Sequence, residues 1–465
     1  MQYETIPPRG TSGGNRQARD RTVAEVLPEG LLAGAFTLQV LRPDAETAER
    51  YRYAWALDAL ALGLAVFGGV HVALILPSRA VSNDFAHYYI SSRLLLTGAD
   101  VYSTPLEPEY DRWGFHYTRG IPTATNPPFL VGMFAPFAAL PPRAAFWAWT
   151  LLETVCLGYV LAATWQLTSS RLSAQARRLV CGAIVASAPV YWHFFFSQCQ
   201  LLIAAMILVA YRFLRKGKPQ RACLVIATAG WLKIFPVVLL PWFLWRASAD
   251  WKMRWKCLGA TLAWSIGIVL ATGWECWKQF WTHGMAVLER WVTWQRHFNF
   301  TVPSFVKNAA WSVHGFNPEW NGLHGWVTVG AVIGLALIAL AYGLSWRTGG
   351  RQKGADLELE FCLLSAAMLA GITEAWGHYF VILGFPAAVG VARIVQRPTC
   401  GRAVILGASL VMLNAMGSWR SPWLEFVVSY IPLYGLLLLG AFFVNEMRCS
   451  APLTASPTTF VPRRS

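Results

Sequence analysis

The sequence predicts an all-α polytopic integral membrane protein with about 12 transmembrane helices. The 465-residue chain is 55% apolar and only 14% charged, and its mean hydropathy is +0.40. Soluble globular proteins carry about 25% charged residues, so the charged fraction of this chain is lower than is typical of them. Long apolar runs bounded by Trp, Tyr and Arg also recur from Trp55 to Val444, as expected of helices that cross a bilayer repeatedly.

The apolar runs divide into twelve spans. Several are shorter than the roughly 20 residues that cross a bilayer squarely, which suggests helices shielded by neighbours or chain breaks at functional depth. The pair that flanks the segment WLKIFP is the clearest case. We place the spans approximately at 54–76, 144–166, 177–193, 200–213, 221–232, 234–246, 257–273, 326–346, 359–373, 376–393, 402–417 and 424–444.

Two polar tails flank a membrane domain at 54–445. We expect 1–53 to be largely disordered with a surface-lying segment at Leu31–Leu41, and 446–465 to be a second disordered tail. No compact apolar segment near the start resembles a signal peptide. Twelve spans place both tails on one side, together with most of the 39 Lys and Arg residues, so the positive-inside rule predicts cytoplasmic tails.

The net charge of +15 therefore follows from membrane topology. Nucleic acid binding needs a contiguous basic surface, and the sequence indicates none, so we expect no nucleic acid partner.

Polar and ionisable residues collect on the opposite, extracytoplasmic side. The loops expected there are 77–143, 193–200, 231–236, 274–325 and 372–378. Ionisable residues inside the spans are few, Asp58 and Glu153 being the main ones, and we find no convincing inverted repeat. A transporter or lipid flippase usually shows more of both. It remains the alternative to an enzyme that acts on the outer side.

Asp84 begins a stretch in which polar side chains share one helical face. Asp84, His87, Tyr88 and Ser91 follow i, i+3, i+4, i+7 spacing. Asp84 is then either the N-cap of an interfacial helix or a catalytic carboxylate, and the spacing alone favours the cap. For His87 and Tyr88 we expect packing.

Lys233 lies between two apolar runs on the outer side. A lysine that faces lipid there costs roughly 2.5–3.5 kcal/mol unless it snorkels or meets an anion. A snorkelling side chain and a phosphate-binding charge are therefore both consistent with this position. Pro236 follows three residues later and frees part of the local backbone.

Two further outer turns carry polar groups. In EAWGHYF, Glu374, Trp376 and His378 stand at the mouth of a span. His378 is either an ordinary interfacial side chain or a contact to an acceptor hydroxyl or phosphate. In HFFFSQCQ, Gln198 and Gln200 either cap a helix or hydrogen-bond a sugar.

The long outer loop at 274–325 is rich in tryptophan. Trp277, Trp281, Leu288 and Trp291 suit a helix lying in the membrane interface. Asn299 begins an N-F-T glycosylation sequon that would lie outside.

Taken in order, five segments resemble glycosyltransferase family 87, whose members use polyprenyl-phosphate sugars. The segments are DFAHYYISSRLLLTGADVY, NPPFLVGMFAPFAALPP, SQCQLLIAAMILVAYRFLRKGK, KIFPVVLLPWFLWR and AWGHYFVILGFP, which together run from Asp84 to Pro386. The family commonly has Tyr where this chain has Asn126, and its Gly-Gln-x-Asn turn reads Ser197-Gln198-Cys199-Gln200 here. These departures bear on the sugar and the acceptor more than on the fold.

The resemblance implies a C-type glycosyltransferase fold and a bacterial plasma membrane enzyme that works on the extracytoplasmic face. The donor would be a hexose on a polyprenyl monophosphate, with mannose the best candidate and arabinofuranose another, and the acceptor a lipid or glycan. Transfer would be inverting, with no metal and no cofactor. The nine cysteines, scattered singly, suggest no metal site either.

The resemblance also assigns roles to residues. Asp84 matches the family's catalytic carboxylate, Lys233 its phosphate-side lysine and His378 its His-Tyr position. An inverting transfer needs a carboxylate to take the acceptor proton and positive charge near the leaving phosphate, and these residues supply both. We also expect substrate-binding contributions from Gln198, Gln200, Asn299, Glu374 and Trp376.

Overall fold

The computed structural model describes residues 45–80, 84–116, 122–248, 250–294, 298–317, 320, 322–349, 357–416 and 428–449. The chain divides into two units, Met1–Tyr51 and Arg52–Ser465. In the first unit only the beginning of helix α1 is described, and the account below concerns the second. Residues 1–44, including the surface segment Leu31–Leu41, and residues 450–465 lie outside the described residues. The expected tail boundaries at 53 and 446 are wrong, because helix α1 already begins at Ala45 and helix α20 continues to Cys449.

The described residues form helices and connecting turns, without a strand among them. The first half contains α1 (Ala45–Arg79), α2 (Asp84–Leu96), α3 (Glu107–Arg112), α4 (Pro128–Ala138), α5 (Pro142–Leu167), α6 (Ala174–Val185), α7 (Ala188–Phe196), α8 (Gln200–Arg215) and α9 (Pro219–Leu232). The second half contains α10 (Leu240–Arg246), α11 (Trp251–Thr272), α12 (Trp274–Gln279), α13 (Met285–Trp294), α14 (Val302–Val313), α15 (Leu323–Gly349), α16 (Leu357–Gly371), α17 (Gly384–Gln396), α18 (Cys400–Asn414) and α20 (Ile431–Cys449). Three tighter or wider helical segments complete it: η1 (Phe235–Leu239), η2 (Phe280–Gly284) and η3 (Gly377–Leu383).

Seven helical stretches of the described chain are long and apolar enough to cross a membrane, so this is an integral membrane protein. They are α1, α5, Ala174–Phe196, α11, α15, Gly377–Gln396 and α20. The sequence predicted twelve spans, more than the seven that qualify by length and hydropathy in the described chain. Each predicted span coincides with a helical segment over its described residues, but α8, α9, Phe235–Arg246, α16 and α18 are too short to qualify by length.

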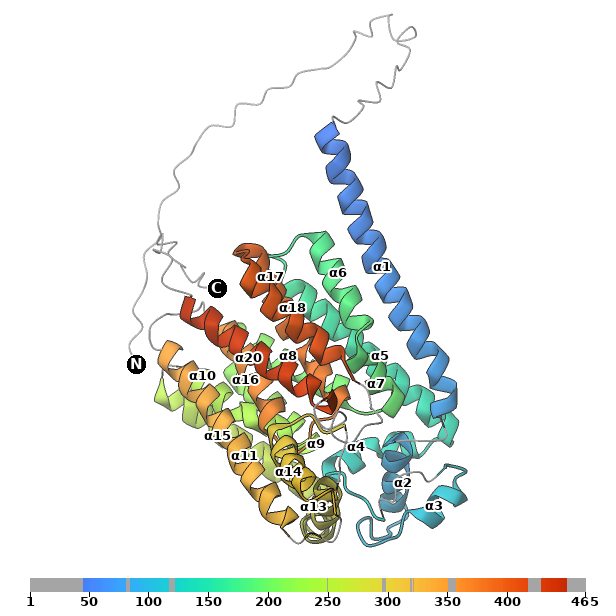
Figure 1. Cartoon of the computed structure of the whole chain (residues 1–465). Helices are drawn as coiled ribbons and strands as arrows, with labels where there is room; N and C mark the ends of the chain where they lie inside the picture. Colours follow the sequence, from blue (N-terminus) through green and yellow to red (C-terminus); the bar gives the residue numbers. More distant parts are fainter. Residues whose placement is uncertain are drawn as a thin grey trace, which may run out of the picture. The chain divides into compact units, whose positions relative to one another are not determined.

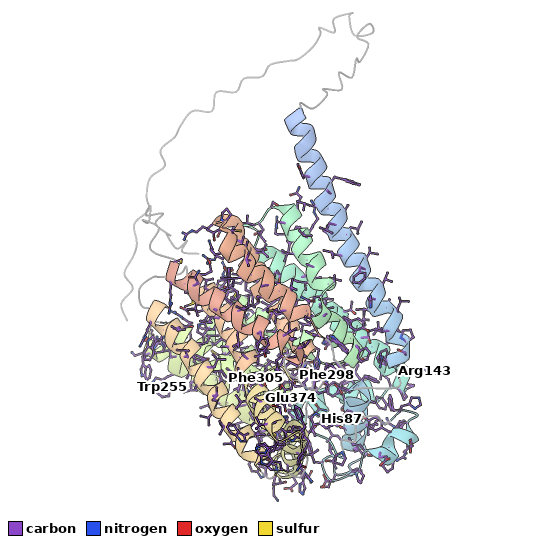
Figure 2. All side chains as sticks on the ribbon, viewed as in Figure 1. His87, Arg143, Trp255, Phe298, Phe305 and Glu374 are labelled. Carbon is purple, nitrogen blue, oxygen red and sulfur yellow. The ribbon has the colours of Figure 1, made fainter. Side chains whose placement is uncertain are left out.

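The outer helices present apolar side chains to their surroundings, as lipid-facing helices do. Figure 1 shows α1 running beside α5, α6 and α7. Leu62 and Leu74 of α1 and Leu270 of α11 are exposed. Trp255 of α11 also lies on the outside of the bundle (Figure 2).

Helix α16 lies at the centre and is buried almost throughout. It packs against α15 and α20. A Cβ on Gly334 of α15 would lie 2.2 Å from the backbone oxygen of Gly371 on α16. Glycine at this crossing therefore allows the two helices to touch through their backbones.

The expected chain breaks occur in the segments 231–236 and 372–378, which were assigned to the outer side from the sequence and are called the outer turns below. Helix α9 ends at Leu232, Lys233 is extended (φ −142°, ψ 130°), and η1 begins at Phe235. Pro236 has no N–H to donate, so a regular α-helix is not continued there. A second interruption precedes η3, where Trp376 is also extended.

Candidate functional site

A cavity of about 400 Å³ opens where these outer turns meet. Its walls come from the N-terminus of α2, the α7–α8 turn, the α9–η1 junction, α13, α15 and the segment that leads into η3. Six of the residues predicted from sequence line it: Asp84, Gln198, Lys233, Glu374, Trp376 and His378.

Asp84 is the first residue of α2 and is only 7% exposed. Its Oδ2 accepts a hydrogen bond from the side-chain amide of Gln198. Asp84 thus stands at the N-terminal end of α2, the end of a helix that favours a negative charge. Asp84 therefore lines the cavity and has a side-chain hydrogen-bond partner. The helical spacing alone had favoured a simple N-cap at this position.

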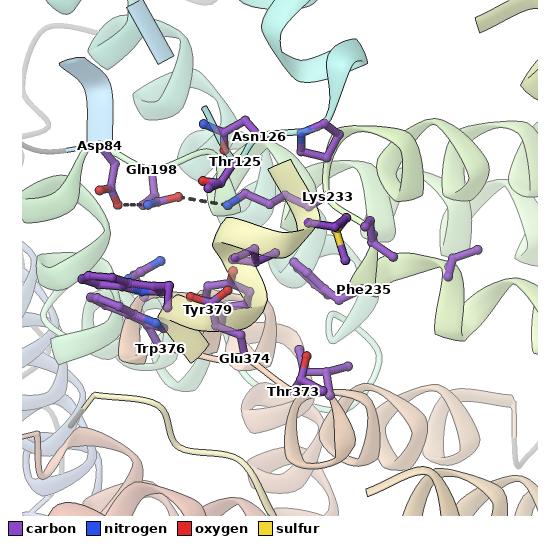
Figure 3. Close-up of a pocket in the computed structure, with 18 of the residues that line it drawn as sticks. Asp84, Thr125, Asn126, Gln198, Lys233, Phe235, Thr373, Glu374, Trp376 and Tyr379 are labelled. Carbon is purple, nitrogen blue, oxygen red and sulfur yellow. Dashed lines mark hydrogen bonds between the residues drawn. The ribbon is translucent and has the colours of Figure 1, made fainter. Parts of the chain in front are cut away.

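Gln198 connects Asp84 with Lys233, as Figure 3 shows. The carboxylate can only accept hydrogen bonds and the ammonium can only donate them. The amide nitrogen of Gln198 therefore faces Asp84, and its oxygen lies 3.5 Å from Lys233 Nζ. This polarised row places a negative and a positive group on either side of one neutral amide.

Tyr88 lies one turn after Asp84 and donates its hydroxyl hydrogen to Gln198 Oε1. Burial, with smaller effects from nearby Cys199 and Asp84, raises the pKa of Tyr88 well above its ordinary value. The hydroxyl therefore remains a donor at neutral pH. The packing expected for Tyr88 holds for its ring, which contacts Phe134 and Trp149, and the hydrogen bond adds a role in the site.

Lys233 enters the cavity from the end of α9. Besides Gln198, its ammonium faces the ring of Tyr379, 5.9 Å from the ring centroid. The two contacts direct Lys233 inward, toward the cavity, where an anionic ligand would meet it.

His378 and Trp376 form the aromatic side of the cavity. Their ring centroids are 5.9 Å apart, and the His378 ring is 5.4 Å from that of Phe196. Glu374 also lines the cavity. A carboxylate, an imidazole and an indole thus face the Asp84–Gln198–Lys233 row (Figure 3).

The other two predicted residues, Asn299 and Gln200, are not among the residues that line the cavity. The amide of Asn299 donates to the Thr373 oxygen and accepts from the Ala375 N–H, both at 2.9 Å. Asn299 thereby holds the segment that carries Glu374. It is 2% exposed, which leaves the N-F-T sequon inaccessible. Gln200 is buried at the start of α8.

The residues of the tryptophan loop predicted to lie in the membrane interface differ in their surroundings. Trp281 is exposed, but Trp277 is buried, and Leu288 and Trp291 line the cavity. Leu288 and Trp291 lie on one face of α13, as their helical spacing predicted. That face turns toward the protein and forms part of the cavity wall.

The loop before α4 also lines the cavity, through Thr125, Asn126 and Pro127. Asn126 was noted from the sequence as a departure from the family pattern, but none of the three was predicted as a site residue. The backbone N–H of Thr125 donates to His87 Nε2 at 3.3 Å. The Asn-Pro-Pro segment was a usable signal, because consecutive prolines fix the chain in an extended form before the helix. No group of three or more potential metal ligands occurs among the described residues.

Fold and site together define an integral membrane protein with a cavity lined by ionisable and aromatic side chains. A family model for glycosyltransferase family 87 matches residues 124–415, and the chain belongs to this family. The matched region includes Gln198, Lys233 and His378, whereas Asp84 precedes it. Searches of curated proteins and of solved structures gave no match.

Proposed function

We propose that this membrane glycosyltransferase moves a hexose, with mannose the best candidate, from a polyprenyl-phosphate sugar to a lipid or glycan acceptor. Transfer inverts the anomeric centre and takes place on the extracytoplasmic face. The observation that carries this proposal is the row Asp84–Gln198–Lys233, in which a carboxylate and an ammonium share one cavity.

Asp84 is the general base in this proposal. An inverting transfer needs one carboxylate to take the proton of the acceptor hydroxyl while positive charge develops at the anomeric carbon. Asp84 lines the cavity and accepts a hydrogen bond from a neutral amide. The amide orients the carboxylate without neutralising it, so Asp84 keeps its capacity to accept the proton.

Lys233 stabilises the leaving polyprenyl phosphate. As the glycosidic bond breaks, negative charge grows on the phosphate, and a preorganised cation lowers the energy of that state. Lysine serves phosphates as a point charge. Lys233 and Asp84 both line the cavity, so phosphate and acceptor would be bound by different residues of one site.

The aromatic side of the cavity binds the sugar. Trp376 and His378 offer faces and a ring nitrogen, and Glu374 offers a hydrogen-bond acceptor. Asn299 contributes through the backbone of residues 373–375, and Gln200 through the start of α8.

A second cavity supports a lipid donor. It has a volume of about 660 Å³, lies between α10, α15 and α16, and shares Leu335 and Ile338 with the first. Leu335, Ile338, Tyr342 and Trp346 follow one face of α15, over about 16 Å of helix. An apolar path that starts at the polar cavity suits a polyprenyl chain whose phosphate lies at Lys233.

The proposed orientation is that of the positive-inside rule, in a bacterial plasma membrane with twelve spans and both termini cytoplasmic. In this orientation the cavity opens at the extracytoplasmic surface of the plasma membrane, where the sugar of the proposed lipid-linked donor would lie.

The proposal is tested by incubating membranes that contain the protein with labelled polyprenyl-phosphate mannose, polyprenyl-phosphate arabinofuranose and a nucleotide sugar. We expect label to pass from a polyprenyl-phosphate sugar to a lipid or glycan, and the Asp84→Asn variant to lose this transfer. Label that moves only from the nucleotide sugar would contradict the donor class. Uptake of intact substrate into sealed vesicles, with no covalent product, would favour a transporter or flippase.

A further inference from the structure

A buried acid and a buried histidine lie beneath the site without lining its cavity. Glu153 of α5 is 1% exposed and His193 of α7 is 0% exposed. Glu153 Oε2 lies 3.0 Å from His193 Nε2. Both residues belong to membrane-spanning helices. Ionisable side chains are rare there because their burial is costly, so the presence of this pair has to be explained.

The pair contacts both ends of the α7–α8 turn, which carries Gln198. Glu153 Oε2 accepts a hydrogen bond from the Leu202 N–H at 3.2 Å, in the first turn of α8. A carboxylate is favoured there because the first N–H groups of a helix lack partners and the helix dipole is positive at this end. On the other side, the Gln198 N–H donates to the backbone oxygen of His193 at 3.3 Å. This bond does not depend on the His193 side chain, which acts on the turn only through its contact with Glu153.

A third contact comes from the same face of α5. Trp149 lies one turn before Glu153, and its indole N–H donates to the Ser197 oxygen at 3.2 Å. Ser197 has a left-handed backbone (φ 52°, ψ 45°), which is strained for a residue other than glycine. Contacts from α5 and α7 therefore hold the turn in a conformation that it would not prefer by itself.

Packing alone does not account for a carboxylate here. Replacing a buried ion pair by apolar side chains of similar volume is often neutral for stability. A leucine would also avoid the cost of burying an ionisable side chain within a span. The benefit of Glu153 is the fixed geometry of the turn, and that turn delivers the amide between Asp84 and Lys233.

We infer that Glu153 and His193 are positioning residues for the transfer reaction, acting through Gln198. They hold the α7–α8 turn so that the Gln198 amide stays between the base and the phosphate-binding lysine. The inference rests on the proposed function, since it assigns the pair a role in that reaction.

The first test is a double-mutant cycle. The combined change Glu153→Leu with His193→Leu leaves no unpaired buried charge. It should lower kcat about 10- to 100-fold while the donor KM changes little, because misplacing a catalytic group costs this much. In a Gln198→Ala background the same change should have almost no further effect on kcat, because residues that act through one group do not add.

Two controls accompany the cycle. Glu153→Gln keeps an oxygen for the Leu202 N–H and should retain much more kcat than the leucine pair. A control pair away from the cavity is Arg402–Glu446, which joins α18 to α20; the change Arg402→Met with Glu446→Leu should leave kcat near the wild-type value. The inference is overturned if the leucine pair keeps full kcat, if its effect multiplies undiminished onto Gln198→Ala, or if the control pair loses kcat equally.

A second measurement is independent of activity. Cys199 follows Gln198 in the turn and is fully buried. Alkylation of Cys199, followed by mass spectrometry of its peptide, should be several-fold faster in the leucine pair than in the wild type or the control pair. Equal protection in all three would overturn the positioning role. Absence of transfer by the wild type from every lipid-linked donor would instead contradict the proposed function.

Discussion

Gln198 links Asp84 and Lys233, and its side-chain oxygen also accepts a hydrogen bond from the Tyr88 hydroxyl. A single neutral amide therefore fixes the geometry of a carboxylate, an ammonium and a phenol. Individual substitutions around it should separate turnover from donor binding, because Asp84 and Lys233 act on different parts of the donor–acceptor pair.

Lys233→Ala should raise the donor KM by about 10- to 100-fold, the equivalent of one hydrogen bond to a charged group. The measurement is initial-rate kinetics with the lipid-linked donor. Lys278→Ala is the matched control, because Lys278 is exposed and pairs only with its neighbour Glu275 among the salt bridges described. An unchanged KM in Lys233→Ala would favour the snorkelling interpretation.

His378→Ala should lower turnover by about tenfold or more, since the ring helps to hold the sugar in its reactive position. The control is His283→Ala, at an exposed position of η2. If His378→Ala keeps both the wild-type rate and the wild-type donor affinity, His378 is an ordinary packed residue.

Much of this residue-level arrangement could be predicted, and part could not. Asp84, Lys233 and His378 could be located at the mouths of apolar spans from the sequence, and the family resemblance distinguished them from an ordinary cap and ordinary interfacial side chains. The bond between Tyr88 and Gln198 was not predictable, because it joins residues 110 positions apart. The substrate contribution of Asn299 stays a prediction. Its hydrogen bonds to the backbone of residues 373 and 375 were not predictable, because they join distant parts of the chain.

At the element scale, the crossing of α15 and α16 positions the cavity wall. Gly371 lines the cavity and faces Gly334 across the crossing. Gly334→Ala should destabilise the protein by about 1–3 kcal/mol, as overpacking does, and lower its melting temperature in detergent. Gly343→Ala on the same helix meets nothing within 4 Å and should leave the melting temperature unchanged. Equal melting temperatures for both variants would show that the crossing tolerates a side chain.

Helices α13 and α14 meet through Lys307, which is 1% exposed and donates to the Val292 oxygen at 2.9 Å. Burial lowers the pKa of Lys307 to about 7, while the unfolded chain keeps a lysine pKa of about 10.4. Between these values the unfolded state binds more protons, so the free energy of unfolding rises with pH.

Thermal denaturation from pH 7 to pH 10 checks this dependence. The wild type should gain stability across the window, and Lys307→Met should flatten the rise, whereas Lys278→Met at an exposed site should not. A Lys307→Met curve with the wild-type slope would rule out Lys307 as its source.

Element boundaries were predicted better than element roles. The apolar runs locate the helices because a helix that crosses lipid needs a long stretch of apolar side chains. The prediction of a chain break at Lys233 is confirmed. The face of α13 was assigned to the membrane interface because its spacing suits either lipid or a cavity. Only the packing of α13 over the site separates these two environments.

For the whole molecule, the arginines of the short loops do more than set topology. Arg171, Arg246 and Arg402 pair with buried glutamates at the ends of α16 and α20. Glu358 and Glu360 stand at the beginning of α16, and Gly371 at its other end lines the cavity. The central helix is thus anchored by ion pairs on the predicted cytoplasmic side and contributes to the site on the opposite side.

The central claim is that Asp84 is the base in a cavity where Lys233 receives the phosphate. The most direct test is the steady-state kcat of Asp84→Asn with the lipid-linked donor, beside Asp111→Asn in the exposed part of the same loop. Asp84→Asn should reduce kcat about 10²- to 10⁴-fold, as loss of a general base does, with donor KM and expression retained, and Asp111→Asn should behave as the wild type. Full turnover by Asp84→Asn would contradict the account.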